Sequence, residues 1–363
     1  MAKFSEVLTI VNGRNQKQVV CDDGKYPIYG SGGIMGYAND YICKAETVVI
    51  GRKGSINKPI FVETPFWNVD TAFGLCANSE KLNSKYLYYF CEKFDFEKLN
   101  TTVTIPSLTK SNLLNVDIPL PNLEKQKQIV ELLDKVTSLI FLRKQQLSKL
   151  DELVKARFVE MFGDPVTNPK GYEKYKLENL ARKISDGVHS KPDYTETGRP
   201  FLSVVNINKG VINFKNCKYV SEDAYQKMIK STHPERGDVL YTKVGATYGI
   251  PAYVDTDIAF CLYVSVCLIK PKREVINPRF LSLSMEMPYV KHQADRRIKG
   301  IGVPDLHLNQ ISEFEILCPP LKEQDIFIYF VERLDGEKRV VQQSLDKLEL
   351  MKKALMQEYF GQL

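Results

Sequence analysis

The chain has 363 residues with a hydrophobic content of 44%, a charged content of 26% and a formal net charge of +6. These values are those of an ordinary globular protein with room for two domains, which excludes a disordered or low-complexity polypeptide. No apolar run is long enough to span a bilayer and the N-terminal residues lack the apolar stretch of a signal peptide, so we expect a cytoplasmic protein without a membrane partner.

The cysteines and histidines give no sign of a metal site. Eight cysteines are scattered without a Cys-x-x-Cys pair, and the four histidines are dispersed. Most of the cysteines fall in apolar runs, which is typical of reduced core thiols. The excess of basic residues permits nucleic-acid binding without requiring it.

The first distinctive element is "YGSGGIMG" at residues 29–36, with four glycines in eight positions. A phosphate-binding loop would need a buried strand before the glycines and a helix after them, or a terminal Gly-Lys-Ser/Thr. The flanking residues form short apolar runs separated by polar turns, so neither context is present. We expect a tight β-turn that uses glycine for positive φ, within a strand-rich region of residues 1–117.

A second strand-rich region covers residues 165–315, and we name residues 1–117 the first head and residues 165–315 the second head. The two share weak landmarks: "AETVVIGRKGS" (45–55) resembles "RGDVLYTKVGA" (236–246), in which a strand is followed by a cation and a glycine. Elsewhere the two sequences diverge, and only the first contains the glycine-rich loop. The pattern indicates a duplicated scaffold with two differently specialised heads.

A clear internal repeat follows each head. Residues 118–164 align without a gap to residues 316–362, and the identical pairs include Gln126 with Gln324. In each copy proline and a polar turn precede a long segment in which apolar residues recur at helical spacing, and glycine follows this segment. We predict one long helix per copy, and residues 123–162 would span ~60 Å at 1.5 Å per residue.

Apolar residues in both helices recur at alternating spacings of three and four, which is a heptad seam. Two arginines interrupt the first seam, whereas Lys338 and Lys352 interrupt the second at other positions. We therefore predict an intramolecular coiled coil; the alternative is that each helix packs only on its own head. The predicted seam residues are Leu133, Val136, Ile140, Leu147, Leu150, Val154, Leu334, Val341, Leu345, Leu348 and Leu355.

This order of elements resembles the specificity subunit of Type I restriction-modification systems over essentially the whole chain. The resemblance is carried by "PLPNLEKQKQIVELLDK" (119–135), a helix ending in "FGD" (162–164), "PPLKEQ" (319–324), "YPIYGSGG" (26–33) and "VVIGRKGS" (48–55). It implies an α+β fold in which two target recognition domains, residues 1–117 and 165–315, are joined by two spacer helices, residues 118–164 and 316–363. The helices of that family form an antiparallel coiled coil with pseudo-twofold symmetry.

The resemblance also implies a function. Each recognition domain would read one half of a bipartite, asymmetric target in double-stranded DNA, while the helices set the spacing and dock two modification subunits. The partner methyltransferase would modify adenine N6 with S-adenosylmethionine, and restriction subunits, where the system has them, would use ATP and Mg. The chain itself is expected to bind no cofactor and no metal, and to have no catalytic residue.

The residues give no independent support for an enzyme. "NPKG" and "CPPL" do not fit the Asn/Asp-Pro-Pro-aromatic tetrapeptide of adenine methyltransferases, and there is no P-loop. Two alternatives stay open to the hypothesis that this chain recognises DNA on behalf of a methyltransferase partner. One is a stand-alone or inactive coiled-coil protein without a methyltransferase partner, and the other is an enzyme with an unrecognised active site.

DNA binding needs cations for phosphates and polar groups for base edges. The first-head candidates are Gly30, Ser31, Gly32, Gly33, Arg52, Lys53, Arg14 and Thr102. The second-head candidates are His189, Ser190, Lys191, Lys243, Thr247, Tyr248, Arg296, Arg297 and Lys299. The alternatives are a solvated hairpin turn at Arg52 and ordinary helix-end charge at Arg296. Trp67 and Tyr29 are expected in packing rather than base stacking.

Overall fold

The computed structural model describes residues 1–100, 107–208, 210–298 and 302–361. The chain forms two compact units. The first unit contains Met1–Gln146 and Val340–Leu363, and the second unit contains Leu147–Arg339. Each unit thus combines one head with part of each long helix, and the recognition-domain boundaries within the units stay a prediction. Among the described residues, no helix is both long and apolar enough to cross a bilayer.

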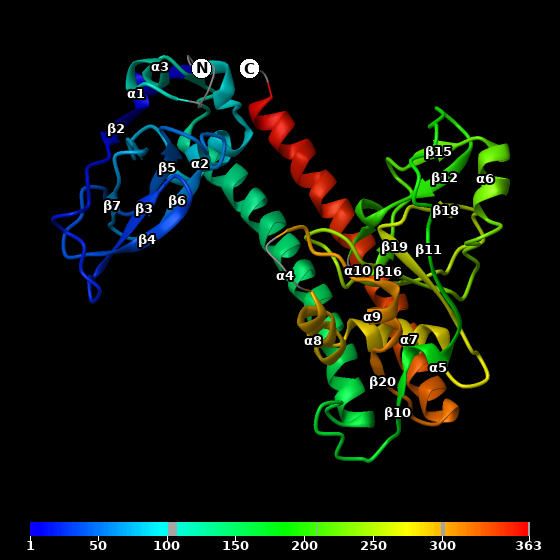
Figure 1. The fold of residues 1–363 in the computed structure, drawn as a ribbon. Coiled ribbons are helices and arrows are strands. Elements are labelled where there is room, and N and C mark those ends of the chain that lie inside the picture. Colours follow the sequence, from blue (N-terminus) through cyan, green and yellow to red (C-terminus); the bar gives the residue numbers. More distant parts are fainter. Residues whose placement is uncertain (101–106, 209, 299–301, 362–363) are drawn as a thin grey trace. The chain divides into compact units, whose positions relative to one another are not determined.

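The first head is built from short strands with a helix packed on them (Figure 1). Its elements are β1 (Ala2–Lys3), α1 (Phe4–Val7), β2 (Leu8–Asn12), β3 (Tyr26–Gly30), β4 (Gly33–Ala38), β5 (Thr47–Gly51), β6 (Ile60–Val62), β7 (Trp67–Asn68), β8 (Ala72–Ala77), α2 (Ser84–Lys93), a 3-10 turn η1 (Phe96–Leu99), α3 (Lys110–Leu114) and β9 (Asp117–Ile118).

The second head is likewise strand-rich and carries more helices (Figure 1). Its elements are β10 (Lys174–Lys176), α5 (Leu177–Leu180), β11 (Ala181–Asp186), β12 (Arg199–Leu202), η2 (Val204–Asn206), β13 (Ile207–Asn208), β14 (Val211–Ile212), β15 (Lys218–Val220), α6 (Glu222–Met228), β16 (Val239–Thr242), β17 (Pro251–Tyr253), β18 (Cys261–Leu262), β19 (Val266–Pro271), α7 (Pro278–Glu286), α8 (Pro288–Arg297), α9 (Leu308–Ser312) and β20 (Glu315–Leu317).

The two main sheets have the same topology in both heads, although the second head also has a two-stranded sheet, β13-β14. The four-stranded sheet has the order β2-β8-β5-β6 in the first head and β11-β19-β16-β17 in the second. The three-stranded sheet has the order β4-β3-β7 in one and β15-β12-β18 in the other, and in both its central strand has one antiparallel and one parallel neighbour. The scaffold is therefore duplicated well beyond the landmarks that sequence comparison detects.

The landmark strands β5 and β16 occupy equivalent central positions in these sheets. All five residues of β5 and all four of β16 are buried. A strand that is covered on both faces reads as a continuous apolar run, which explains the strings "TVVIG" and "VLYT". Arg52 follows β5 and Lys243 follows β16, so the two cations lie at equivalent ends of the corresponding sheets.

The two long helices have the lengths that their sequences predict. Helix α4 (Leu123–Phe162) and helix α10 (Leu321–Phe360) each contain 40 residues. The Asn122 side chain accepts a hydrogen bond from the backbone of Lys125 and caps α4. Gly163 ends the helix with a φ of +78°, a conformation that favours glycine.

In the first unit, the start of α4 and the end of α10 both pack into the core of the first head. Ile129 and Leu133 of α4 share one buried cluster with Phe360 of α10. The Phe360 ring lies 5.0 Å from the Tyr86 ring and 6.1 Å from the Phe90 ring, both on α2. The last turn of the chain therefore completes the core of its N-terminal head.

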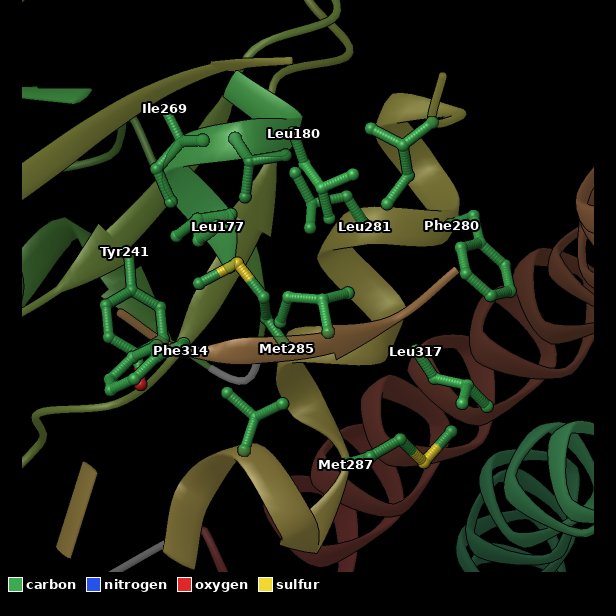
Figure 2. Packing of buried hydrophobic residues seen from close by; sticks show 14 of the residues in the cluster. Leu177, Leu180, Tyr241, Ile269, Phe280, Leu281, Met285, Met287, Phe314 and Leu317 are labelled. Atoms are coloured by element: carbon green, nitrogen blue, oxygen red, sulfur yellow. The ribbon is translucent and has the colours of Figure 1, made fainter. Parts of the chain in front are cut away.

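In the second unit, the roles of the two helices are exchanged. Phe158 and Phe162 at the end of α4 pack against Phe327 at the start of α10, with ring centroids 5.7 and 5.6 Å apart, and against Phe280 of α7. Phe280 also belongs to a larger buried cluster, part of which Figure 2 shows: side chains of α5, α7 and β20, such as Leu177, Leu281 and Leu317, gather beside the strands of the four-stranded sheet.

Within each unit the two helices are antiparallel. In the first unit the start of α4 packs near Phe360 at the end of α10, and further along α4 Lys144 forms an ion pair with Glu349 (2.8 Å). In the second unit Phe162 at the end of α4 packs on Phe327 at the start of α10, and Asp151 forms an ion pair with Lys338 (2.7 Å). The structure confirms the coiled-coil prediction, although each helix also packs on the heads. Of the predicted seam residues, Leu133, Val136, Val154, Leu334, Val341 and Leu345 are buried, and Ile140, Leu147, Leu150, Leu348 and Leu355 are half-buried.

The repeated glutamine near each helix start has the same role in both units. Gln126 and Gln324 are fully buried. The Oε1 atom of each accepts a hydrogen bond at 2.8 Å from the backbone of the asparagine that caps a helix of the head, Asn83 for α2 and Asn277 for α7. Their Nε2 groups donate to backbone carbonyls. A buried amide with satisfied donors and acceptors fixes each helix to its head.

Candidate nucleic-acid interface

The glycine-rich sequence forms the β3–β4 hairpin. Gly30 pairs with Gly33, so that Ser31 and Gly32 make a two-residue turn. Gly33 has a φ of +116°, which explains glycine at this position. The expected tight β-turn is confirmed, and no helix follows the glycines as a nucleotide-binding loop would require.

A second turn, residues 69–71 between β7 and β8, is the point where three segments of the first head meet. We name it the β7–β8 turn; it is closed by a hydrogen bond from the Ala72 amide to the Val69 carbonyl. Three further backbone hydrogen bonds connect Val69 to Tyr29 (3.0 Å), Arg14 to Asn68 (2.8 Å) and Arg52 to Thr71 (2.8 Å). The turn thereby brings the segments of Arg14, the hairpin and Arg52 to one edge of the head.

Two glycines allow this close approach. A Cβ atom on Gly13 would lie 1.7 Å from the Val69 carbonyl oxygen, so any other residue would push the segment of Arg14 away. A Cβ atom on Gly51 would lie 2.4 Å from the Ser55 carbonyl oxygen and 3.0 Å from Cβ of Ser31. The basic turn at Arg52 and the hairpin turn at Ser31 are therefore in direct proximity.

The structure brings most of the predicted first-head residues to this edge. Arg14, Gly32, Arg52 and Lys53 are exposed, Ser31 and Gly33 are half-buried, and Gly30 is buried. The guanidinium of Arg52 lies 5.7 Å from the centre of the Phe73 ring. Trp67 is buried and its indole N–H donates to the Arg14 carbonyl at 3.0 Å, in agreement with its expected packing role. Thr102 lies outside the described residues.

The second head repeats the same backbone arrangement around the connection between β18 and β19. A turn closed by a hydrogen bond from Val266 to Tyr263 replaces the one from Ala72 to Val69. The remaining backbone hydrogen bonds connect Tyr263 to Leu202 (2.8 Å), Val188 to Leu262 (2.8 Å) and Lys243 to Ser265 (3.0 Å). A Cβ atom on Gly187, the counterpart of Gly13, would lie 2.2 Å from the Leu262 carbonyl oxygen.

This correspondence places Lys243 where the first head has Arg52, but the two cations differ. The Lys243 side chain is 6% exposed and lies between Asp186 (3.5 Å) and Asp305 (3.7 Å). Burial raises the pKa of Asp186, and the charge of Lys243 opposes that shift. This burial does not favour the predicted DNA contact of Lys243, because its ammonium cannot reach a phosphate without losing both carboxylate partners.

The other second-head candidates fall into two groups. His189, Ser190, Lys191, Thr247 and Arg296 are exposed, although His189 Nε2 lies 3.8 Å from the Asp186 carboxylate and the Lys191 ammonium lies 5.7 Å from the centre of the Tyr194 ring. Tyr248 and Arg297 already have intramolecular partners. The Tyr248 hydroxyl donates to Asp295 at 2.6 Å, and Arg297 donates to the Gln293 carbonyl at 3.0 Å and lies over Phe314. Lys299 lies outside the described residues.

Sequence reasoning missed the pair of glycines that fix the edges. Gly13 in "IVNGR" and Gly187 in "ISDGV" both follow a strand and an Asn or Asp residue. This short repeat is a usable signal, although it is visible only once the strands are aligned. The sequence pattern also gave no indication of Asp70 and Thr71, which form the exposed tip of the β7–β8 turn.

The edge of the first head has the chemistry of a surface that binds nucleic acid. Exposed guanidinium and ammonium groups are the chemistry that phosphate contacts need, and hydroxyl and backbone groups are the chemistry that polar contacts to base edges need. Across the described parts of the chain, no three His, Cys, Asp or Glu residues are grouped so that they could hold a metal ion. Burial raises the pKa of the Cys43 and Cys261 thiols to about 12, which leaves them unreactive at neutral pH.

Comparison with known proteins agrees with this arrangement. The chain is 22% identical over 348 residues to the Type I restriction enzyme EcoBI specificity subunit of Escherichia coli, covering 87% of this chain and 73% of that protein. It is 24% identical over 334 residues to the Type I restriction enzyme MjaVIII specificity subunit of Methanocaldococcus jannaschii, covering 86% of this chain and 75% of that protein.

The fold has a close counterpart among solved structures. The crystal structure of a Type I restriction-modification S subunit from M. genitalium matches with a TM-score of 0.65 and 16% identity, over 99% of this chain and 95% of that one. The sequence also matches the Type I restriction modification DNA specificity domain over residues 1–152 and 169–350. Because this match leaves only short segments uncovered, the chain belongs to the family of Type I restriction-modification DNA specificity proteins.

Proposed function

We propose that this chain is the DNA sequence-recognition subunit of a Type I restriction-modification complex, and that each head reads one half of a bipartite target. The observation that carries the proposal is the pair of heads with the same main-sheet topology within a chain that matches the DNA specificity family in both halves. Two copies of one scaffold, connected by helices, suit two half-sites separated by bases that neither head reads.

The target of such a chain would be asymmetric, because the two heads have different side chains at structurally equivalent positions. The first head presents an exposed Arg52, whereas the matching Lys243 is neutralised by two carboxylates. The exposed Asp70 of the β7–β8 turn corresponds to the half-buried Val264. Different side chains at equivalent positions would read different bases.

The chemistry of modification would come from partners that dock on the helices. Exposed apolar residues recur at aligned positions of α4 and α10: Leu142 with Val340 (55% and 67% exposed) and Leu153 with Met351 (45% and 51%). Exposure of large apolar side chains in both copies supports two equivalent docking surfaces, and hence two modification subunits. Those subunits would use S-adenosylmethionine to methylate adenine, and restriction subunits would use ATP and Mg.

Arg52→Ala is expected to weaken binding to one half-site only. Removing one cation should cost about 1–3 kcal/mol if Arg52 reads a base, or reduce the salt dependence of binding by about one charge if it contacts a phosphate. The measurement is a salt titration of binding to duplexes in which either half-site is scrambled. Lys127→Ala, which removes an exposed cation from α4, is the matched control. Equal affinities of the Arg52→Ala and Lys127→Ala chains would contradict this assignment.

Leu142→Asp is expected to weaken docking of the modification subunit and to leave half-site binding by the chain unchanged. The substitution places a charge on an apolar surface that a partner would bury, where an unpaired charge is costly. Size-exclusion chromatography of the complex measures the docking. Lys149→Asp, at an exposed polar position of the same helix, is the control for the added charge. A stable complex with the Leu142→Asp chain would place the docking surface elsewhere.

A further inference from the structure

We propose that Asp70 is a base-reading residue of the first head and that it accepts a hydrogen bond from the N4 amino group of a cytosine. This inference deepens the proposed function and rests on it. The observations that carry it are the position of Asp70 in the β7–β8 turn, the charges around it and the different residue at the matching position of the second head.

The backbone of Asp70 is held in place from several sides. It is a central residue of the turn closed between Val69 and Ala72, and the flanking residues are hydrogen-bonded to the segments of Tyr29 and Arg52. The Asp70 side chain is exposed at the tip of this turn. A rigid backbone that presents a single short polar side chain is suited to reading one base at a defined position.

The charge of Asp70 is opposite to that of its surroundings. Arg14, Arg52 and Lys53 on the adjoining segments are exposed cations, yet within the described residues the Asp70 carboxylate has no ion-pair partner and accepts no hydrogen bond. A carboxylate on a surface that binds phosphates is repelled by DNA unless it meets a hydrogen-bond donor. The donors that DNA offers are the exocyclic amino groups of its bases.

Among these donors, cytosine N4 fits a carboxylate best. An ionised carboxylate only accepts hydrogen bonds, and in the major groove the adenine amino group lies beside the N7 acceptor, which would repel it. Cytosine presents its amino group there without such a neighbouring acceptor on the same base. Guanine also has an amino group, N2, which donates only in the narrower minor groove. The experiment therefore has to distinguish a contact to guanine N2 from one to cytosine N4.

The second head supplies an internal comparison. Its matching turn between Tyr263 and Val266 places Val264 at the position of Asp70. A valine side chain accepts no hydrogen bond, and the cation at the base of that turn, Lys243, is already neutralised by Asp186 and Asp305. The carboxylate at the tip therefore belongs to the first head alone and would act on the first half-site alone.

The test selects bound sequences from a pool of randomised duplex DNA, using the full-length chain in complex with its modification subunit. The unmodified chain should select a G·C pair at one position of one half-site. Asp70→Ala should reduce the preference at that position about tenfold, because the variant lacks the carboxylate that would contact the base. Asp70→Asn should favour an A·T pair there, because an amide side chain both donates to N7 and accepts from N6 of adenine.

Further measurements separate the possible outcomes. Inosine in place of the paired guanine removes the N2 amino group and keeps cytosine N4, so binding should not change; weakened binding would assign the contact to guanine and overturn the proposal. Selected sequences that are identical for the Asp70 variants and the unmodified chain would also overturn it. If the Asp70 variants select the same sequences as the unmodified chain but Arg52→Ala still weakens binding to one half-site, DNA recognition by the first head is supported and the base-reading role of Asp70 is refuted. If the unmodified chain selects no sequence at all, the proposed function itself fails.

Discussion

Phe360→Ala is expected to destabilise the first head by about 3–5 kcal/mol, although residue 360 lies at the opposite end of the sequence. The Phe360 side chain is 1% exposed and packs against Tyr86 and Phe90 of α2. Its removal would leave a cavity in the core that also contains Leu133 of α4. A loss of this size is a large fraction of the 5–15 kcal/mol by which a typical domain is stable.

Hydrogen exchange followed by mass spectrometry measures this effect region by region. With Phe360→Ala, peptides from β5, β8 and α2 should exchange faster, while peptides from β16, β19 and α7 keep their protection. Phe162→Ala is the matched control at the aligned position of α4, and it should give the reverse pattern because Phe162 packs on Phe280 and Phe327. Equal loss of protection in both heads, or none in either, would contradict the exchanged roles of the helix ends.

Lys243→Ala is expected to destabilise the second head by about 3 kcal/mol, whereas Arg52→Ala at the matching position of the first head should have little effect on stability. Lys243 compensates the charge of Asp186, whose side chain is only 13% exposed, and removing one partner of a buried pair leaves the other uncompensated. Arg52 has an exposed side chain, so its loss strands no buried charge. The two substitutions should therefore separate folding from DNA binding.

Chemical denaturation at several pH values tests this contrast. Burial places the pKa of Asp186 above its ordinary value, so this carboxylate destabilises the folded state once pH rises above the unfolded pKa. Without Lys243 that penalty should grow, and it should shrink again as pH falls and Asp186 becomes protonated. Asp186→Asn in the Lys243→Ala background should restore part of the lost stability. A pH-independent loss, or equal losses for Lys243→Ala and Arg52→Ala, would contradict the buried ion pairs.

The sequence predicts the helical part of this fold well because its signals are local and repeated. Helix α4 begins and ends at the predicted residues, since proline, a polar turn and Gly163 mark its limits. The heptad spacing likewise identifies residues that the structure buries, such as Leu133 and Leu345. Periodicity does not show that Phe162 and Phe360 each enter the core of a head, because both lie in the last turn, where partners come from distant strands.

The candidate site could be predicted only in part. The sequence predicts that "IGRKGS" and the glycine-rich hairpin act together, and the structure places Gly51 beside Ser31, while their role in DNA binding stays a prediction. The position of Lys243 was recognised, but its burial was not, since Asp186 and Asp305 are distant in sequence and meet it only through the sheet. The β7–β8 turn was missed because its importance lies in backbone hydrogen bonds, which leave almost no mark on side-chain pattern.

The proposed function requires that this chain directs a methyltransferase to a bipartite DNA sequence. Single-molecule sequencing of methylated adenines in genomic DNA from the source strain, with and without the gene, measures this directly. Deletion of the gene should remove methylation from one asymmetric motif made of two half-sites and an unread spacer, and the intact gene should restore it. An unchanged set of methylated motifs would contradict the claim and favour a coiled-coil protein that acts without a methyltransferase.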